Sequence, residues 1–220
     1  MKRFYVFILL LSAFFLLNAT NINVFGGLGI SFLTGDVSRV TLITGEEIDI
    51  IPAKASYGIG ASLDIPVGSM ILEPGLRFIS GGSLYKENTR ETINGAVWMD
   101  YKYEETLTLN YLDIFAKVKF SSGSLKPYVG LGLPILLSAK LDTKMSDFGV
   151  SINDNNTDVK DFYAGTNFNL MIGADLVLLE KIIIGAGYSR HLNNILTKGD
   201  KSVNLNNFML NIGYKFDLNR

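Results

Sequence analysis

The chain has 220 residues, a length that suits one domain, and it contains no cysteine, which excludes a disulfide framework, a thiolate metal site and a lipid-modified N-terminal cysteine. Its 20 Lys and Arg residues nearly balance its 21 Asp and Glu residues, so the charge indicates no nucleic-acid partner. The 22 glycines and the mean hydropathy of +0.25 argue against long helices, because glycine costs about 1 kcal/mol relative to alanine inside a helix.

The N-terminal segment has the charged, apolar and small-residue order that is typical of a secretory signal peptide. Two basic residues precede an apolar segment at residues 4–17, and a small-residue cleavage site follows after Ala19. We therefore predict a signal peptide at residues 1–19 and a single mature domain at residues 20–220. The alternative is a membrane-anchoring helix, although the apolar segment is short for a span. Further along the chain, no stretch has the eighteen or more apolar residues that a membrane helix needs.

The mature chain alternates apolar and polar residues with a period of two, which is the pattern of β-strands with two different faces. In the last segment, Leu210, Ile212 and Tyr214 are separated by Asn211 and Gly213. The alternation predicts eight strands, at residues 22–33, 54–65, 70–80, 104–120, 128–138, 167–176, 181–191 and 207–216.

The connections between these strands alternate strictly between short and long. Short links lie at residues 66–69, 121–124 and 179–180, and long polar links lie at residues 34–53, 81–103, 141–163 and 192–204. With an even number of strands, this places every long loop at one end and both termini at the other, as in outer-membrane barrels. We predict an all-β protein: an eight-stranded antiparallel up-and-down transmembrane β-barrel.

The two faces of the predicted strands differ in polarity, and this separates two kinds of barrel. A soluble lipocalin-type barrel has its apolar face inside, whereas a membrane barrel has it outside around a polar lumen. The nearly unbroken apolar face favours the membrane barrel. The opposite face carries charged residues that we expect to form a structural ion-pair network across the lumen and to block any open channel: Asp64, Glu73, Arg77, Asp113, Lys117 and Asp175, with His191 on the same face.

Aromatic residues recur at two heights of the apolar face. Rings at two levels are typical of the interfacial girdles of outer-membrane barrels, although aromatic residues are also common in strands in general. The predicted girdle at the long-loop end contains Phe32, Tyr57, Phe78, Phe168, Tyr188 and Phe208, and the one at the short-turn end contains Phe120, Tyr214 and Phe216.

Three places interrupt the alternation. Pro74 and Pro134 lie inside predicted strands, where a missing N–H predicts a β-bulge at each. The apolar residues at 107–111 are out of phase with those at 112–118, which predicts either a bulge near residues 110–112 or a strand that rises above the membrane.

Several strand-end motifs resemble a known family. They are Tyr111-Leu112-Asp113-Ile114, Lys126-Pro127-Tyr128-Val129-Gly130-Leu131-Gly132, Gly185-Ala186-Gly187-Tyr188 and Asn211-Ile212-Gly213-Tyr214-Lys215-Phe216. With these motifs the mature chain, most clearly residues 104–216, resembles the PorT-like outer-membrane β-barrel domain family, which is similar to eight-stranded barrels of the OmpA/OmpX type. The resemblance implies the bacterial outer membrane and a role associated with a protein-secretion apparatus. Such barrels commonly end on an aromatic residue, whereas four further residues follow Phe216 here.

The motifs that could indicate catalysis or metal binding match known patterns only in part. Ser189 and His191, with Asp113 or Glu73 as a third member, could form a hydrolase triad, but the Ser-x-His order is opposite to that of outer-membrane lipid A deacylases. Residues 153–158 have oxygen ligands at calcium-like spacing but lack the glycine and glutamate of an EF-hand, which predicts a solvated loop tip. We expect no cofactor and no metal.

The second long loop contains Asn94-Gly95, a strong hairpin signal, between two segments that read as strands. A hairpin projecting from the membrane would offer unpaired edges to a partner strand, with Trp98, Tyr101 and Tyr103 as candidate anchors; a disordered surface loop is the alternative. We therefore expect a monomeric, non-enzymatic outer-membrane protein, surrounded by outer-membrane lipid, that acts structurally or binds a protein partner through its external loops. The alternatives are a lipid-acting hydrolase using Ser189 and His191, or a small diffusion pore.

Overall fold

The computed structural model describes residues 19–36, 39–41, 47–49, 53–93, 96–120, 123–147, 150–197 and 202–218. The predicted signal peptide, apart from Ala19, lies outside the described residues.

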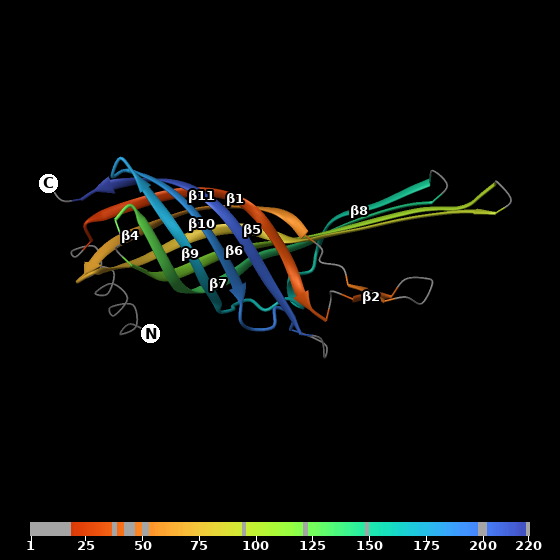
Figure 1. Cartoon of the computed structure of the whole chain (residues 1–220). Coiled ribbons are helices and arrows are strands. Elements are labelled where there is room, and N and C mark those ends of the chain that lie inside the picture. The colour runs from red at the N-terminus through yellow and green to blue at the C-terminus, as the bar shows by residue number, and fades with distance from the viewer. Residues whose placement is uncertain are drawn as a thin grey trace.

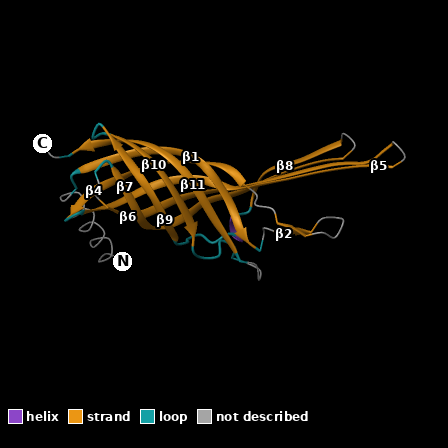
Figure 2. Cartoon of the chain, viewed as in Figure 1, coloured by secondary structure: helices purple, strands orange, loops and turns teal. Residues whose placement is uncertain are grey.

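Eight strands close into a ring, as the sequence predicts (Figures 1 and 2). Going round the ring, neighbouring strands pair in the order β6-β5-β4-β1-β11-β10-β9-β7, every pair is antiparallel, and pairing of β6 with β7 closes it. The ring strands are β1 (Asn21–Gly35), β4 (Ala53–Val67), β5 (Met70–Ile93), β6 (Ala96–Phe120), β7 (Leu125–Asp147), β9 (Asn169–Leu178), β10 (Ile182–His191) and β11 (Val203–Asp217). Outside it are β2 (Arg39–Thr41), β3 (Glu47–Asp49), β8 (Val150–Asp158) and the 3-10 turn η1 (Lys160–Phe162).

Residues 20 and 218 lie at the short-turn end of the barrel. The Thr20 N–H donates to the Asp64 carbonyl at 2.9 Å, and the Leu218 N–H donates to the Thr20 carbonyl at 2.8 Å. In the short turn between β9 and β10, Leu179 and Glu180 both have positive φ, 50° and 62°, the combination that a two-residue hairpin of matching twist requires.

The wall of the barrel is apolar outside and carries polar and charged side chains inside. Large apolar side chains point outward all round the ring, and Leu28, Ile59, Leu131 and Ile212 are more than half exposed. The buried side chains of the interior include charged residues such as Glu73, Asp113 and Lys117 beside an apolar group. Since burial of apolar surface drives folding in water, this arrangement suits lipid around the barrel and excludes the lipocalin-type alternative.

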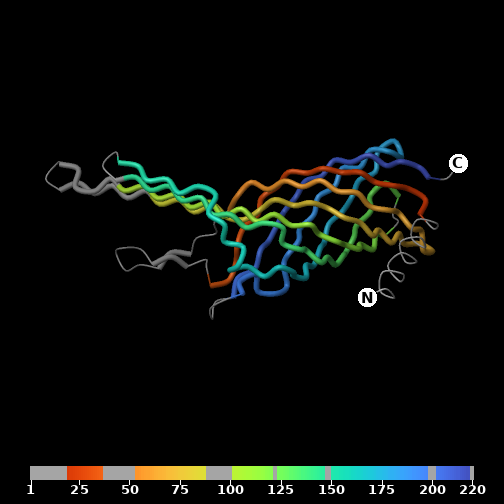
Figure 3. Tube along the Cα trace, turned by 180° about the vertical axis from the view of Figure 1, so that it is seen from behind, coloured from red at the N-terminus to blue at the C-terminus, as the bar shows by residue number. Residues whose placement is uncertain are grey.

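Three ring strands, β5, β6 and β7, continue beyond the ring and are joined by β8 to form an extension, here called the arm (residues 83–93, 96–106, 140–147 and 150–158; Figure 3). β5 pairs with β4 only as far as Ser80, but with β6 as far as Ile93. β7 then pairs with β6 up to Asp147, and β8 adds to the far side of β7. Residues 81–93 would extend roughly 40 Å at about 3.3 Å per residue.

The arm confirms the hairpin predicted for the second long loop, although the turn at Asn94-Gly95 lies outside the described residues. It also corrects the prediction that residues 141–163 form a loop. These residues continue β7 and form β8, and Asn153 to Asp158 lie on an exposed edge strand rather than in a loop tip.

The predicted bulges at Pro74 and Pro134 are wrong. The register between β4 and β5 is the same on both sides of Pro74, and only two intervening residue pairs drop out of the ladder. Pro134 is in register with Asp113, and the bulge comes three residues later, where Leu137 is the extra residue in β7. Because β6 itself is regular, its residues 107, 109 and 111 face inward with Asp113, so the bulge at this height belongs to the neighbouring strand.

Candidate functional site

An ion cluster joins three strands around one carboxylate inside the barrel, that of Glu73 on β5. Lys117 Nζ lies 3.3 Å from Glu73 Oε1, and Lys119 Nζ contacts the other oxygen of the same carboxylate. Lys119 Nζ also lies 2.6 Å from Asp175 Oδ2 on β9, and the Ser62 hydroxyl donates to Glu73 Oε1 at 2.8 Å. All five residues are buried, so these charges meet the requirement that ions inside a protein be paired and hydrogen-bonded.

A second buried pair lies nearer the long-loop end. Arg77 on β5 holds Asp113 on β6 with two nitrogens, Nε at 2.9 Å and Nη2 at 2.8 Å from Oδ2. The Asn169 amide donates to the same oxygen at 3.1 Å. Arg77 and Asp113 are direct neighbours in the β5–β6 register, so pairing of the strands alone brings them together.

All six charged residues that the sequence assigns to the lumen lie inside the barrel. The observed network of contacts differs from the predicted one in two respects. Asp64 accepts a hydrogen bond from Asn23 Nδ2 at 2.8 Å rather than contacting a cation. Lys119, which joins Glu73 to Asp175, is absent from the predicted set. Lys119 lies at even spacing from Asp113 and Lys117 on the same strand. The period-two alternation was therefore sufficient to predict that its side chain faces the lumen.

A layer of aromatic rings surrounds the ammonium group of Lys117. Its Nζ lies 4.9 Å from the ring centroid of Phe115, 4.7 Å from that of Tyr128 and 5.5 Å from that of Phe25. Such cation–π contacts gain strength when they are shielded from water. The Tyr128 hydroxyl reaches past β9 to β10, where a methyl group on Gly187 would overlap it, so glycine there makes room for the ring.

The long-loop end of the lumen is filled by an apolar cluster. Two segments that follow β8 and β10 meet over it, where the Ala164 N–H donates to the Ile195 carbonyl at 2.7 Å and the Thr197 N–H to the Phe162 carbonyl at 3.0 Å. The cluster consists of Leu33, Leu107, Leu109, Tyr111, Leu136, Ala139, Ile195, Val203 and Leu205. It explains why residues 107–111 look out of phase: they are apolar and face inward.

A small cavity lies inside the barrel, next to the ion clusters. Beside Arg77, Tyr128 and Met171, the described part of the barrel holds a cavity of about 10 Å³. This is room for about one water molecule. In the structure described, ion pairs, rings and apolar side chains thus fill the interior.

The residues of the candidate hydrolase triad are not assembled. Ser189 and His191 are buried in the lumen, and no hydrogen bond joins them in the described part of the structure. The His191 ring packs edge-on against the Tyr111 ring, with centroids 5.1 Å apart. The proposed acids are engaged elsewhere, since Asp113 is bound by Arg77 and Glu73 by two lysines.

The nine predicted girdle residues differ in exposure. Tyr57, Phe168 and Phe208 at the long-loop end, and Phe120, Tyr214 and Phe216 at the short-turn end, are exposed on the outer wall. Phe32, Phe78 and Tyr188 are half-buried. The Phe78 ring lies 6.2 Å from that of Tyr57, and the Tyr188 hydroxyl donates to Asn206 at 2.6 Å.

One side of the arm, here called the aromatic face, carries tyrosines and apolar side chains. The ring of Tyr103 lies 5.9 Å from that of Tyr85 and 6.4 Å from that of Tyr101. The Tyr85 hydroxyl donates to Glu87 at 3.0 Å, and burial together with this bond raises the pKa of Tyr85 to about 12. The Trp98 side chain lies outside the described part of the structure.

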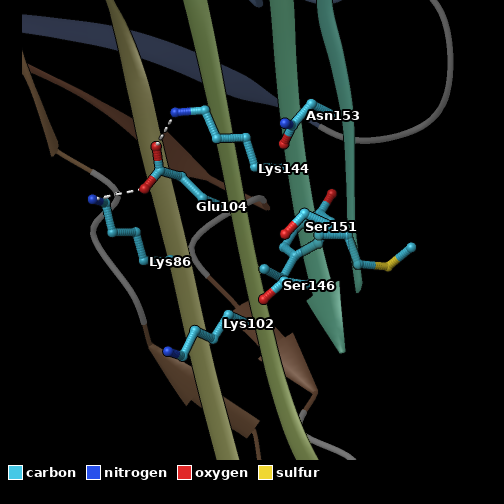
Figure 4. Close-up of a pocket in the computed structure, with 9 residues that line it drawn as sticks. Lys86, Lys102, Glu104, Lys144, Ser146, Ser151 and Asn153 are labelled. Atoms are coloured by element: carbon cyan, nitrogen blue, oxygen red, sulfur yellow. Dashed lines mark hydrogen bonds and ion pairs between the residues drawn. The ribbon is translucent and has the colours of Figure 1, made fainter. Parts of the chain in front are cut away.

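The other side of the arm, here called the basic face, carries Lys86, Lys102, Glu104 and Lys144 (Figure 4). Glu104 lies between two lysines, 2.8 Å from Lys86 Nζ and 3.3 Å from Lys144 Nζ. Hydrogen bonds from these lysines hold the pKa of Glu104 below its usual range.

The described residues contain no helix of the length and hydropathy that would span a membrane. They also contain no group of three or more His, Cys, Asp or Glu side chains placed to hold a metal ion, and this includes the calcium-like run at residues 153–158.

The closed ring with an apolar wall defines a β-barrel membrane protein, and comparison of the sequence with protein families gives its class. Residues 6–216 match the outer membrane protein beta-barrel domain. The chain therefore belongs to this family, and its location is the bacterial outer membrane. No curated protein matches the sequence.

Solved structures share the barrel at low identity. Ail of Yersinia pestis is 16% identical with a TM-score of 0.42, over 90% of this chain and 99% of Ail. Neisserial surface protein A is 11% identical with a TM-score of 0.42, over 89% of this chain and 97% of that protein. The outer membrane enzyme PagL is 15% identical with a TM-score of 0.39, over 89% of this chain and 99% of PagL. These likenesses concern the fold alone.

Proposed function

We propose that this protein is a monomeric, non-enzymatic outer-membrane barrel that binds a protein partner outside the membrane through its arm. The observation that carries the proposal is the arm itself, an ordered sheet that continues well beyond the barrel. A barrel that only stabilised the membrane would need no such extension. The ring closes on itself through β6 and β7, so it needs no second copy to complete it.

The edge of β5 is the part of the arm best suited to a partner strand. Beyond Ser80, β5 is paired with β6 on one side, and the described residues provide no strand on the other. A row of backbone donors and acceptors along such an edge can add an extended segment of another protein, while adjacent side chains select it. Tyr85 and Tyr103 on the aromatic face would supply such contacts, as rigid aromatic anchors often do.

The opposite edge, β8, is less regular. Its register with β7 shifts between Leu141 and Thr143, and Asn156 has a positive φ of 61°. Irregular edges of this kind resist strand addition. This contrast favours β5 as the partner edge.

The filled lumen supports the choice of a binding protein over the alternatives. Eight strands leave an interior that side chains fill, and the ion pairs of Glu73 and Asp113 do so here. The burial of Ser189 and His191 speaks against a lipid-acting hydrolase. If the likeness to PorT-like barrels extends to function, the partner is a component of a protein-secretion apparatus.

Photo-crosslinking in intact cells tests the proposal. p-Benzoylphenylalanine replaces Glu87 on the β5 edge, and Leu192 in an exposed segment at the same end of the barrel serves as the matched position. We expect a discrete adduct with one partner protein at position 87 and none at position 192. Replacing residues 86–102 with a short Gly-Ser turn should then abolish binding of that partner while the barrel still shows heat-modifiable gel mobility. No adduct at position 87, or equal adducts at both positions, would contradict the proposal.

A further inference from the structure

The basic face of the arm shares its side of each strand with the lipid-facing wall of the barrel. Along β6, Lys102 and Glu104 alternate in phase with Ile114, whose side chain points outward. Along β5, Lys86 has the same phase as Phe78 and follows it by eight residues, roughly 25 Å at about 3.3 Å per residue. If Phe78 marks the level of the lipid headgroups, Lys86 lies among the saccharides that outer-leaflet glycolipids carry.

The side chains of this face have an excess of positive charge. Three lysines, at positions 86, 102 and 144, line the pocket together with the single carboxylate of Glu104. Lys86 and Lys144 are 55% and 57% exposed, and exposed ion pairs of this kind are weak. Lys102 makes no ion pair in the described part of the structure. All three ammonium groups are therefore available to an anion at little cost.

Neutral hydrogen-bond donors lie next to these lysines. The face is hollowed into a shallow pocket of about 340 Å³, and Ser146, Ser151 and Asn153 from β7 and β8 line it together with the lysines (Figure 4). Hydroxyl and amide groups suit a saccharide, and several ammonium donors suit a phosphate, whose oxygens accept charge-assisted hydrogen bonds. Further down the same face, Lys140 and Asp142 are both engaged by Asn156, which accepts from Lys140 Nζ at 3.2 Å and donates to Asp142 Oδ1 at 2.6 Å.

We infer that the basic face binds phosphate groups carried by the saccharide of an outer-leaflet glycolipid. The lysines on three different strands would grip the phosphates, and the hydroxyl and amide side chains would contact the sugars. Glu104 pairs with both Lys86 and Lys144 and therefore competes with the ligand for them. This inference does not depend on a protein partner at the β5 edge, because it uses the lysine side chains of the basic face and not the backbone groups of that edge.

The test measures binding of phosphorylated lipopolysaccharide to the full-length mature protein, folded in detergent, by isothermal titration calorimetry. The triple substitution Lys86→Gln, Lys102→Gln and Lys144→Gln removes the charges of the pocket. The matched control, Lys126→Gln, Lys181→Gln and Lys215→Gln, removes the same charge at the short-turn end. Heat-modifiable gel mobility and the circular dichroism spectrum establish that each variant is folded.

We expect the pocket variant to bind on the order of tenfold more weakly and the control variant to bind like the wild type, since each exposed charge contributes a small part of the affinity. Binding should also weaken as the salt concentration rises. Glu104→Gln should bind about threefold more tightly, because it removes the competing carboxylate from an exposed lysine pair. Weaker binding by Glu104→Gln would mean that the lysines only position that carboxylate and do not bind the phosphate themselves. This result would overturn the inference.

Two further ligands distinguish the sources of the phosphate. Dephosphorylated lipopolysaccharide and inorganic phosphate should each bind much more weakly than the phosphorylated glycolipid. Equal affinity for inorganic phosphate would overturn the assignment to a glycolipid. Equal affinity for the dephosphorylated form, or equal losses in the pocket and control variants, would overturn the phosphate site itself.

Discussion

Glu73 provides the sharpest test of how the interior holds the barrel together. Its carboxylate is nearly inaccessible and binds Lys117 and Lys119, so Glu73→Gln keeps the shape of the side chain but leaves Lys117 without its anionic partner. Removing one member of a buried ion pair typically costs 3–5 kcal/mol. Lys119 retains Asp175, which places the expected loss at the lower limit, about 3 kcal/mol, or roughly a hundredfold in the ratio of folded to unfolded protein.

Glu104 offers a matched control, because it too bridges two lysines but does so on the exposed arm. Glu104→Gln should therefore leave the stability of the barrel nearly unchanged. The assay is urea unfolding of the protein refolded in detergent micelles, followed by circular dichroism of the strands and by gel mobility without heating. Equal urea midpoints for wild type and Glu73→Gln would refute the argument that this carboxylate neutralises the lumen.

A second substitution separates loss of charge balance from loss of packing. Lys117→Met in the Glu73→Gln background removes the unpaired ammonium and places an apolar chain among the rings of Phe25, Phe115 and Tyr128. Replacing both members of a buried pair with groups of similar shape is often nearly neutral. The double variant should recover most of the lost stability, whereas a further loss would assign the effect to packing.

Three other predictions follow from the structure and the sequence. Reconstituted in planar bilayers, the protein should show no stable conductance, because side chains fill its lumen; steady channels in purified protein would contradict this. N-terminal sequencing of membrane-extracted protein should begin near Thr20, and retention of Met1 would rule out the predicted signal peptide. The lowered pKa of Glu104 means that its pairs with Lys86 and Lys144 hold at neutral pH and are lost as the pH falls from the ordinary glutamate value of about 4.3 through the lowered pKa. Hydrogen exchange of the arm amides, corrected for intrinsic rates, should show this acid loosening in the wild type and not in Glu104→Gln.

The sequence determined which side of each barrel strand faces lipid. Leu210 and Ile212 lie outside and Glu73 and Asp113 inside, because alternation with a period of two is a property of the strand itself and needs no knowledge of its neighbours. The strict order of short and long links determined the up-and-down ring in the same way. These features are local, and the sequence contains them in full.

The tertiary structure alone decided what happens where the local pattern is weak. Residues 150–158 are mostly polar and exposed, yet they form a strand because the extended backbone of β7 offers them a partner ladder. The bulge at Leu137 arises from the fit between β6 and β7, and no residue type marks it. At Pro74, where the sequence predicts a bulge, the strand only loses two residue pairs from its ladder with β4.

The partners within the lumen were likewise decided by the assembled ring. Register between β5 and β6 brings Glu73 to Lys117, whereas Lys119 on β6 reaches Asp175 on β9 past the intervening strand β7, which requires the curvature of the barrel wall. Contacts across a barrel depend on its diameter and on the stagger of all its strands, which are properties of the assembled ring rather than of any one segment.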